Sequence, residues 1–295
     1  MTAQRTPPTN GSRPTRRTKA DIEYLRCLLR EVVAEQQPMT VRQVFYQLVS
    51  RGAIDKTEGE YKRTVVRLLK EMRLAGTLPF GWIADSTRWM RKPTTHSSLE
   101  GALWQMARFY RRARWDEQDV YVEVWCEKDA LAGVLYDVTS EWDVPLMVTR
   151  GYPSLSYLHE ASEVIAEKKR PVYLYYFGDH DPSGVDIARS TEARLRQFAP
   201  VAEMHFEVLG VTPQQIAVWS LPTRPTKQGD SRYAGFRGES VEVDAIPPDT
   251  LRALATEAIA QHVDRTVIDG LEEAEKDERK MLRWFAREVQ EASDG

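Results

Sequence analysis

The stretch VYLYYFGDHDPSG, residues 172–184, decides the fold of this chain. A run of apolar and aromatic residues ends there at two aspartates, Asp179 and Asp181, and the start of a helix follows. An earlier stretch, VYVEVWCEKDA at 120–130, has the same form and ends at Glu127. Each reads as a buried strand followed by a helix, and alternating strands and helices predict a parallel sheet. The sequence therefore predicts an α/β fold with acidic residues at the carboxyl ends of two strands.

Three carboxylates would meet where these strands end. In an open parallel sheet, ligands and ions bind at the carboxyl ends of the strands. Two unit charges ~4 Å apart repel by roughly 4 kcal/mol at an effective dielectric of ~20, and a divalent cation removes that cost. The all-oxygen set of Glu127, Asp179 and Asp181 suits Mg²⁺ or Mn²⁺. We therefore expect a catalytic magnesium site; the alternative is a group of surface acids at strand ends.

Two neighbouring residues bear on this site. Lys128 is the local cation, available to a phosphate or to a salt bridge with Asp129 or another neighbour. A site of hard oxygen ligands does not need His180, which we expect to be a spacer between the two aspartates or to lie behind the ligands.

The remaining pattern extends the α/β region in both directions. Further strands are expected at 145–149 and 203–209, with helices at 129–141, 154–168 and 184–198. Residues 97–115 read as a connecting helix, 211–248 as irregular, and 249–293 as one or two helices.

The charge of the chain is unevenly distributed along its 295 residues. Residues 1–115 carry 22 Lys and Arg against 10 Asp and Glu, whereas residues 116–295 carry 19 against 34. A basic part joined to an acidic part indicates a nucleic-acid-binding module followed by a metal-binding one. The alternative is a chance distribution of surface charge.

Three helices are expected in the basic part, at 20–36, 41–51 and 59–75. The third places Val65, Leu68, Leu69 and Met72 on one face, and the basic residues Lys62, Arg63, Arg67, Lys70 and Arg73 occupy the rest. A hairpin-like stretch follows, with 82–89 as a strand. This order describes a winged helix-turn-helix whose third helix enters the major groove of double-stranded DNA. The alternative for the basic face is simple solvation.

Tyr46 is a second candidate for chemistry. At 100° per residue the apolar stripe of helix 41–51 leaves Tyr46 off the core face. Arg42 lies one turn earlier on the same side, where its guanidinium can favour a phenolate and hold a phosphate. The alternative is a half-buried tyrosine with its hydroxyl in water.

The sequence contains no sign of export or membrane insertion. No apolar run reaches the ~20 residues of a membrane span, and no hydrophobic secretion signal is present. Cys27 and Cys126 lie far apart and form no CxxC pair, so neither a disulfide scaffold nor a zinc site is expected. We expect a cytoplasmic protein associated with the nucleoid.

These motifs resemble a known family. A Glu followed one α/β unit later by DxDPxG resembles the Toprim fold, and GDHDPSG at 178–184 is similar to the A subunit of topoisomerase VI, a type IIB DNA topoisomerase, and to its meiotic double-strand-break relative. That family carries R-x-[hydrophobic]-[Phe/Tyr]-Tyr in an N-terminal winged helix, and RQVFY, Arg42 to Tyr46, is similar. The segment LGVTPQQI at 209–216 resembles the one that follows the Toprim acids.

The resemblance implies an organisation and a mechanism. The regions would be a disordered basic tail (1–19), a winged-helix domain (20–95), a connecting helix (96–118), a Toprim domain (119–265) and a C-terminal helix (266–295). In the family, the tyrosine matched by Tyr46 attacks a DNA phosphodiester and becomes 5′-phosphotyrosyl, while the matched acids hold Mg²⁺. The tyrosine of one protomer works with the acids of the other, which implies a homodimer, and a separate ATPase subunit drives strand passage.

Three functions follow from these observations. The resemblance favours a DNA-cleaving transesterase of the topoisomerase VI A type, with Tyr46 as nucleophile and Arg42 positioning the phosphate. A Toprim nuclease would use the same metal site to activate water, with Tyr46 only structural. A non-catalytic DNA-binding protein is the third, and the three clustered acids argue against it.

Overall fold

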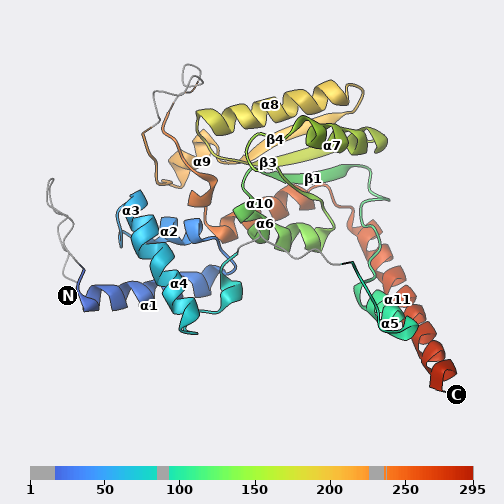
Figure 1. Cartoon of the computed structure of the whole chain (residues 1–295). Helices are drawn as coiled ribbons and strands as arrows, with labels where there is room; N and C mark the ends of the chain where they lie inside the picture. Colours follow the sequence, from blue (N-terminus) through green and yellow to red (C-terminus); the bar gives the residue numbers. More distant parts are fainter. Residues whose placement is uncertain (1–16, 85–92, 226–235, 237, 295) are drawn as a thin grey trace.

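A parallel sheet forms the centre of the molecule, with a helical region on one side and a two-helix arm on the other (Figure 1). The computed structural model describes residues 17–84, 93–225, 236 and 238–294. Most of the tail expected at 1–19 lies outside this range.

The four strands are parallel and lie in the order β2-β1-β3-β4. They are β1 (Tyr121–Cys126), β2 (Leu146–Val148), β3 (Val172–Phe177) and β4 (Met204–Gly210). The register pairs Cys126 with Phe177, so the two acidic stretches begin side by side at the same edge of the sheet. The α/β fold and the parallel sheet expected from the alternating pattern are confirmed.

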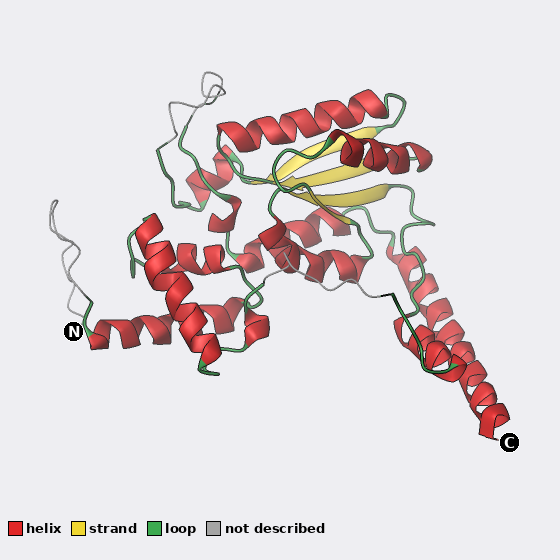
Figure 2. Ribbon diagram, viewed as in Figure 1, coloured by secondary structure: helices red, strands yellow, loops and turns green. Residues whose placement is uncertain are grey.

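Helices cover both faces of the sheet (Figure 2). One layer contains α6 (Asp129–Trp142) and α10 (Pro248–Ala260), and the other contains α7 (Leu155–Glu167) and α8 (Pro182–Phe198). The expected irregular segment 211–248 contains a short helix, α9 (Pro213–Val218), and a single 3₁₀ turn, Val243–Ala245. The strands β1 and β3 are almost entirely apolar or aromatic because both of their faces are covered, and Glu123 on β1 is the exception.

The N-terminal helical region spans residues 17–84. It contains α1 (Lys19–Gln36), α2 (Val41–Ser50), α3 (Glu58–Glu60) and α4 (Arg67–Leu74), with a π-helical segment, Tyr61–Val66, joining α3 to α4. Thr18 and Thr40 start α1 and α2 with capping boxes. The predicted third helix, 59–75, corresponds to α3, the π-helical segment and α4 together. The face expected to be apolar in it is buried, at Val65, Leu68, Leu69 and Met72.

The wing expected after the third helix is described only in part. Residues 85–89 of the strand proposed at 82–89 lie outside the described residues. Before them, the 3₁₀ turn Phe80–Trp82 leads to a parallel bridge between Ile83 and Met39. The described part is therefore a bridge to the loop before α2, and the antiparallel hairpin stays a prediction.

The arm consists of two long-separated segments of sequence, α5 (Leu99–Phe109) and α11 (Arg265–Asp294) (Figure 1). The prediction of a helix over 97–115 is wrong at the C-terminal end, because α5 ends at Phe109. Residues 110–113 are not helical and contact other helices instead. The Tyr110 hydroxyl donates to Glu278 on α11 at 2.8 Å, and the Arg111 guanidinium donates to the Ser140 carbonyl of α6. These contacts offset the loss of another helical turn.

One buried acid in the sheet makes stability depend on pH. Glu123 on β1 is 2% exposed, and its Oε2 accepts a hydrogen bond from Trp125 Nε1 at 2.8 Å. Burial raises the pKa of Glu123 to about 7, while the Trp125 hydrogen bond opposes the rise. The unfolded chain ionises this carboxyl near its ordinary value of 4.5. The stability that the neutral acid contributes is therefore present below pH 4.5 and is lost as the pH rises to about 7.

Glu123→Gln is expected to remove this loss, because the amide stays neutral and its oxygen can still accept from Trp125. The unfolding free energy of the variant, relative to wild type, should rise between about pH 4.5 and 7 by roughly 3 kcal/mol. Urea unfolding at a series of pH values measures the difference. Glu207→Gln, at an exposed position on β4, should show a flat difference, and a flat difference for Glu123→Gln would contradict the prediction.

Candidate functional site

At the edge of the sheet that carries the predicted acids, His180 pairs with Val241, a residue of the segment expected to be irregular. His180 and Val241 exchange backbone hydrogen bonds of 2.9 Å in both directions. The Val243 N–H then donates to Asp179 Oδ1 at 2.8 Å. The segment 240–244 therefore lies against residues 179–181, which we call the DHD loop. It brings two further buried acids, Glu242 and Asp244, to the site. His180 acts as the expected spacer through its backbone.

Sequence reasoning missed Glu242 and Asp244. Residues 241–244 read Val-Glu-Val-Asp, an alternation that is typical of a strand with one acidic face. This signal was present, but the flanking Pro and Gly residues made the whole stretch 211–248 appear irregular. Only the contact with the DHD loop shows that these acids belong to the site.

Lys128 is the central cation of this cluster. Its Nζ lies 2.8 Å from Asp179 Oδ1, 2.8 Å from Asp244 Oδ2 and 3.6 Å from Glu242 Oε2. Burial alone would lower the pKa of Lys128, but Asp244, Asp179 and Glu242 outweigh it and raise the pKa. Lys128 therefore stays charged and neutralises part of the site. Its expected alternative partner, Asp129, pairs with Arg150 instead.

Glu127 and Asp179 lie close together, as the sheet register predicts. The Asp179 N–H donates to Glu127 Oε2 at 3.1 Å. Burial, and after it the charge of Asp179, raises the pKa of Glu127 to about 7. Within the described part of the chain, Glu127 has no cationic partner, and its Oε1 and Asp179 Oδ2 accept no hydrogen bond. Two carboxylates that repel each other and keep free oxygens fit a divalent cation.

Asp181 has a different set of contacts. Its Oδ1 accepts from the Gly184 N–H at 2.8 Å and so caps α8, and its Oδ2 pairs with Arg224 at 3.2 Å. Over the described ranges, no three acidic, histidine or cysteine side chains form a ready-made metal cage. Mg²⁺ typically binds one or two carboxylates and completes its shell with water and substrate phosphate. The pair Glu127 and Asp179 meets that need, with Asp181 at its edge.

A close backbone contact explains why the DxDPxG pattern has a glycine at Gly184. A Cβ on Gly184 would lie 2.1 Å from the Asp179 carbonyl oxygen. Gly184→Ala is therefore expected to displace the Asp179 loop and to destabilise the fold by about 1–3 kcal/mol, measured by thermal unfolding. Gly270→Ala on α11 is the control, since a Cβ there meets nothing within 4 Å, and it should be neutral or stabilising by up to about 1 kcal/mol. Equal stability of the two variants would contradict this account.

Tyr46 is buried, contrary to the position expected for it off the core face. The side chain is 2% exposed, because α2 packs not only on its own region but also on the Val243–Ala245 turn. Burial, followed by the charge of Glu242, raises the pKa of Tyr46, and Arg42 only partly opposes this. The expected phenolate is therefore disfavoured in this conformation. Across the described residues the Tyr46 hydroxyl accepts and donates no hydrogen bond.

Arg42 does not lie free beside the phenol. Its Nε pairs with Glu242 Oε2 at 3.1 Å, and its guanidinium lies over the Tyr61 ring, 4.5 Å from the centroid. The cation next to Tyr46 is Lys56, whose Nζ lies 5.2 Å from the centroid of the Tyr46 ring and donates to the Pro222 carbonyl. Burial lowers the pKa of Lys56 to about 8. Sequence reasoning missed this residue, which carries no motif.

The basic face of the third helix is exposed as expected at Lys62, Arg63, Arg67 and Lys70. Part of its charge is neutralised, since Lys62 pairs with Glu58 and Arg67 with Glu71. Arg73 is partly buried, with its guanidinium over the Phe80 ring. DNA binding by this face stays a prediction.

Comparison with protein-family models and with curated proteins found no match to this sequence. Among the described residues, no helix combines the length and the apolar character needed to cross a membrane.

Proposed function

We propose that this protein cleaves DNA in a Mg²⁺-dependent reaction at the edge of the sheet formed by Glu127 and Asp179. The observation that carries the proposal is the pairing of these two carboxylates at adjacent strand ends, with oxygens that no described residue satisfies. Mn²⁺ would fit the same donors. Winged-helix and Toprim folds for the two regions belong to the same proposal, supported by the element order and by the DxDPxG pattern.

The site residues divide the work of such a reaction. A divalent cation held by Glu127 and Asp179 would stabilise negative charge on the phosphate oxygens. Lys128 holds Asp179 through its Oδ1, so Oδ2 would be the oxygen that binds a cation. Asp181 fixes the start of α8 and holds Arg224 next to the acids. The exposed basic face of the third helix would bind the DNA backbone.

Hydrolysis by water is the mechanism that the geometry supports best. Tyr46 is almost fully covered, its pKa is raised, and Arg42 is engaged with Glu242. A phenol in this state is a poor nucleophile. Water is not limited by burial in this way, because Glu127 and Asp179 are both partly exposed.

Transesterification by Tyr46 is a second candidate, favoured by one observation. Lys56 lies over the Tyr46 ring, and a lysine with a pKa of about 8 is partly neutral near neutral pH. It could accept the phenol proton once α2 moves away from the Val243–Ala245 turn.

Tyr46→Phe separates the two mechanisms, because it removes one oxygen and little packing. Under hydrolysis we expect cleavage of labelled duplex DNA with Mg²⁺ at close to the wild-type rate, and no protein–DNA adduct on a denaturing gel. Tyr61→Phe is the matched control, a neighbouring tyrosine that lies under Arg42. Loss of all cleavage in Tyr46→Phe alone, together with a covalent band in wild type, would establish the transesterase. Intact DNA with wild type and either metal would leave a DNA-binding protein.

A further inference from the structure

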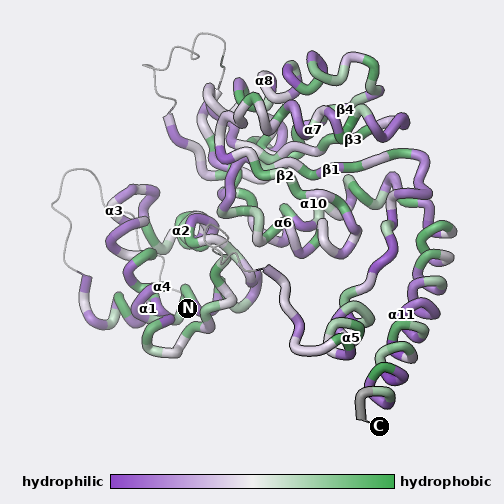
Figure 3. The backbone as a smooth tube through the Cα atoms, turned by 45° about the vertical axis from the view of Figure 1, so that its right-hand side comes forward, coloured by the Kyte–Doolittle hydropathy of each residue, from purple (hydrophilic) through white to green (hydrophobic). Residues whose placement is uncertain are grey.

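Two helices form the arm, which extends away from the sheet (Figure 3). The residues that follow α5 pair first with Glu278 and then, further along the chain, with Glu272, so α5 and α11 are antiparallel. Ala107 on α5 and Ala286 on α11 are 1% and 0% exposed, and they mark the line where the helices meet. In an antiparallel pair, the residues one position after these alanines lie on one side of the arm, and the residues one position before them lie on the other.

The two sides of the arm differ in chemistry. Arg108 and Arg287 follow the alanines and are exposed, and the exposed Arg283 lies one turn before Arg287 on the same side. Met106 and Phe285 precede the alanines, so these exposed apolar residues lie on the opposite side. We call the side with the three arginines the basic face. A partner bound by the arginines therefore does not also cover these apolar residues.

The basic face lacks negative charge of its own. Within the described residues its three arginines form no ion pair, whereas Arg279, nearer the sheet, pairs with Glu275. Cations that lie close together without a counter-charge repel one another, and a bound anion removes that repulsion. Arginine is also the residue whose planar group best matches a phosphate. The charge of this face therefore selects an anionic partner, and its chemistry suits phosphate.

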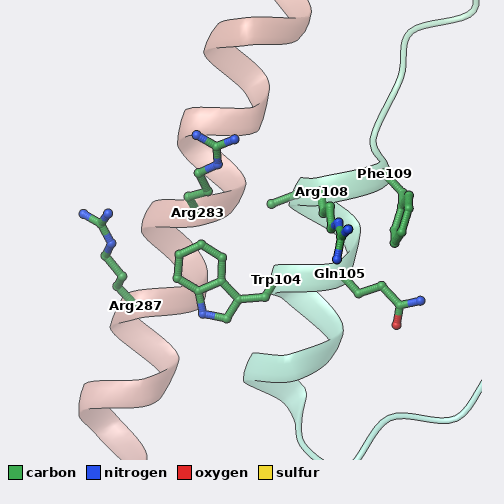
Figure 4. A pocket seen from close by; sticks show the side chains of 7 residues that line it. Trp104, Gln105, Arg108, Phe109, Arg283 and Arg287 are labelled. Carbon is green, nitrogen blue, oxygen red and sulfur yellow. The ribbon is translucent and has the colours of Figure 1, made fainter.

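An aromatic ring lies among these cations. Trp104, Gln105 and the three arginines line a hollow of about 790 Å³ between the two helices. The Trp104 indole lies beside Arg283 and Arg287, and Arg108 projects from the next turn of α5 (Figure 4). Trp104 is only partly buried, which leaves part of its ring open to a planar group. An aromatic ring surrounded by cations is the combination with which proteins bind unpaired bases and their phosphates.

Other anionic partners use less of this site. The bases of a duplex are stacked on one another and present only their edges, so a duplex would contact the arginines and not the indole. An acidic peptide would likewise pair with the arginines alone. In a single strand, the phosphates would contact the arginines, a base would stack on Trp104, and base edges would bond with the Gln105 amide.

We propose that the basic face of the arm binds an unpaired DNA strand, with its phosphates on Arg108, Arg283 and Arg287 and one base stacked on Trp104. This would be a second nucleic-acid contact, separate from the sheet-edge acids and from the third helix. The choice of DNA over RNA rests on the proposed function, whereas the site for an unpaired strand does not.

Fluorescence anisotropy of a labelled oligo-dT of about 15 nucleotides, with the full chain and without Mg²⁺, tests the proposal. For a single strand, each phosphate contact contributes about 0.7 to the slope of log affinity against log salt. Arg283→Ala with Arg287→Ala should therefore lower the slope by about 1.4 and raise the Kd at least about tenfold. Arg189→Ala with Arg194→Ala removes the same charge from exposed positions on α8 and should change neither quantity.

The stacking contact has its own test. Trp104→Leu keeps an apolar side chain between the helices but removes the ring, and it should raise the Kd for oligo-dT about tenfold. Trp104→Phe keeps a ring and should restore most of that affinity. A role of Trp104 in packing the arm alone would give the two variants the same Kd. Circular dichroism checks that both variants are folded.

Four results would overturn the proposal. The first is an unchanged Kd and salt slope in the Arg283 and Arg287 variant, and the second is an equal Kd for the two folded Trp104 variants. The third is a duplex of equal length, or poly-glutamate, that binds the basic face more tightly than oligo-dT. The fourth is tighter binding of oligo-U, which would make the strand RNA. Each is measured without cleavage, so failure of the cleavage proposal is a separate result.

Discussion

Asp179→Asn is expected to abolish Mg²⁺-dependent DNA cleavage and to leave the fold intact. The amide keeps the shape of the side chain and can still accept from the Val243 N–H, but it removes one of the two charges proposed to hold the cation. Burial raises the pKa of Asp179 against the opposing effect of Lys128, so the folded state tolerates a neutral group here. Lys128 keeps Asp244 as a partner. Loss of a metal ligand should reduce the rate by about a thousandfold or more.

Cleavage is measured with end-labelled duplex DNA over a Mg²⁺ titration, and stability by urea unfolding without metal. Asp186→Asn is the matched control: it is an acid on α8, the helix that follows Asp179, and it pairs with Arg189. That variant should cleave like wild type. If Asp179→Asn cuts DNA at the wild-type rate, the proposed metal site is wrong, whichever nucleophile is used.

The second large effect concerns folding. Lys128→Ala is expected to lower the free energy of unfolding by about 3–5 kcal/mol, because it leaves several buried carboxylates without their shared cation. Asp179, Asp244 and Glu242 all lie within 3.6 Å of its Nζ. Mg²⁺ should restore part of the loss, since a cation at Glu127 and Asp179 compensates the same charge.

Two variants make this prediction specific. Lys62→Ala removes an exposed lysine that pairs with Glu58, and it should change stability by no more than about 0.5 kcal/mol. Adding Asp244→Asn to Lys128→Ala should recover stability, because it removes one unpaired charge. A loss below 1 kcal/mol for Lys128→Ala, in urea unfolding without metal, would mean that water rather than Lys128 compensates these acids.

Local patterns in the sequence determined the sheet and the first part of the site. Apolar runs that stop at Glu127 and at Asp179 predict adjacent parallel strands, and the register of β1 and β3 agrees. The apolar face of the third helix was predicted in the same way and is buried at Leu68 and Leu69. These features depend on periods of two or 3.6 residues within one element, which a sequence shows directly.

Contacts between distant segments decided the rest. Tyr46 lies off the stripe of its own helix, yet it is buried because the Val243–Ala245 turn packs on α2. Glu242 and Asp244 join the site through contacts between distant segments, in which Val241 pairs with His180 and the Val243 N–H donates to Asp179. The arm forms from α5 and α11, which are more than 150 residues apart in sequence. The periodicity of one segment shows which face is apolar, but not which distant segment covers it, because that choice depends on packing across the whole fold.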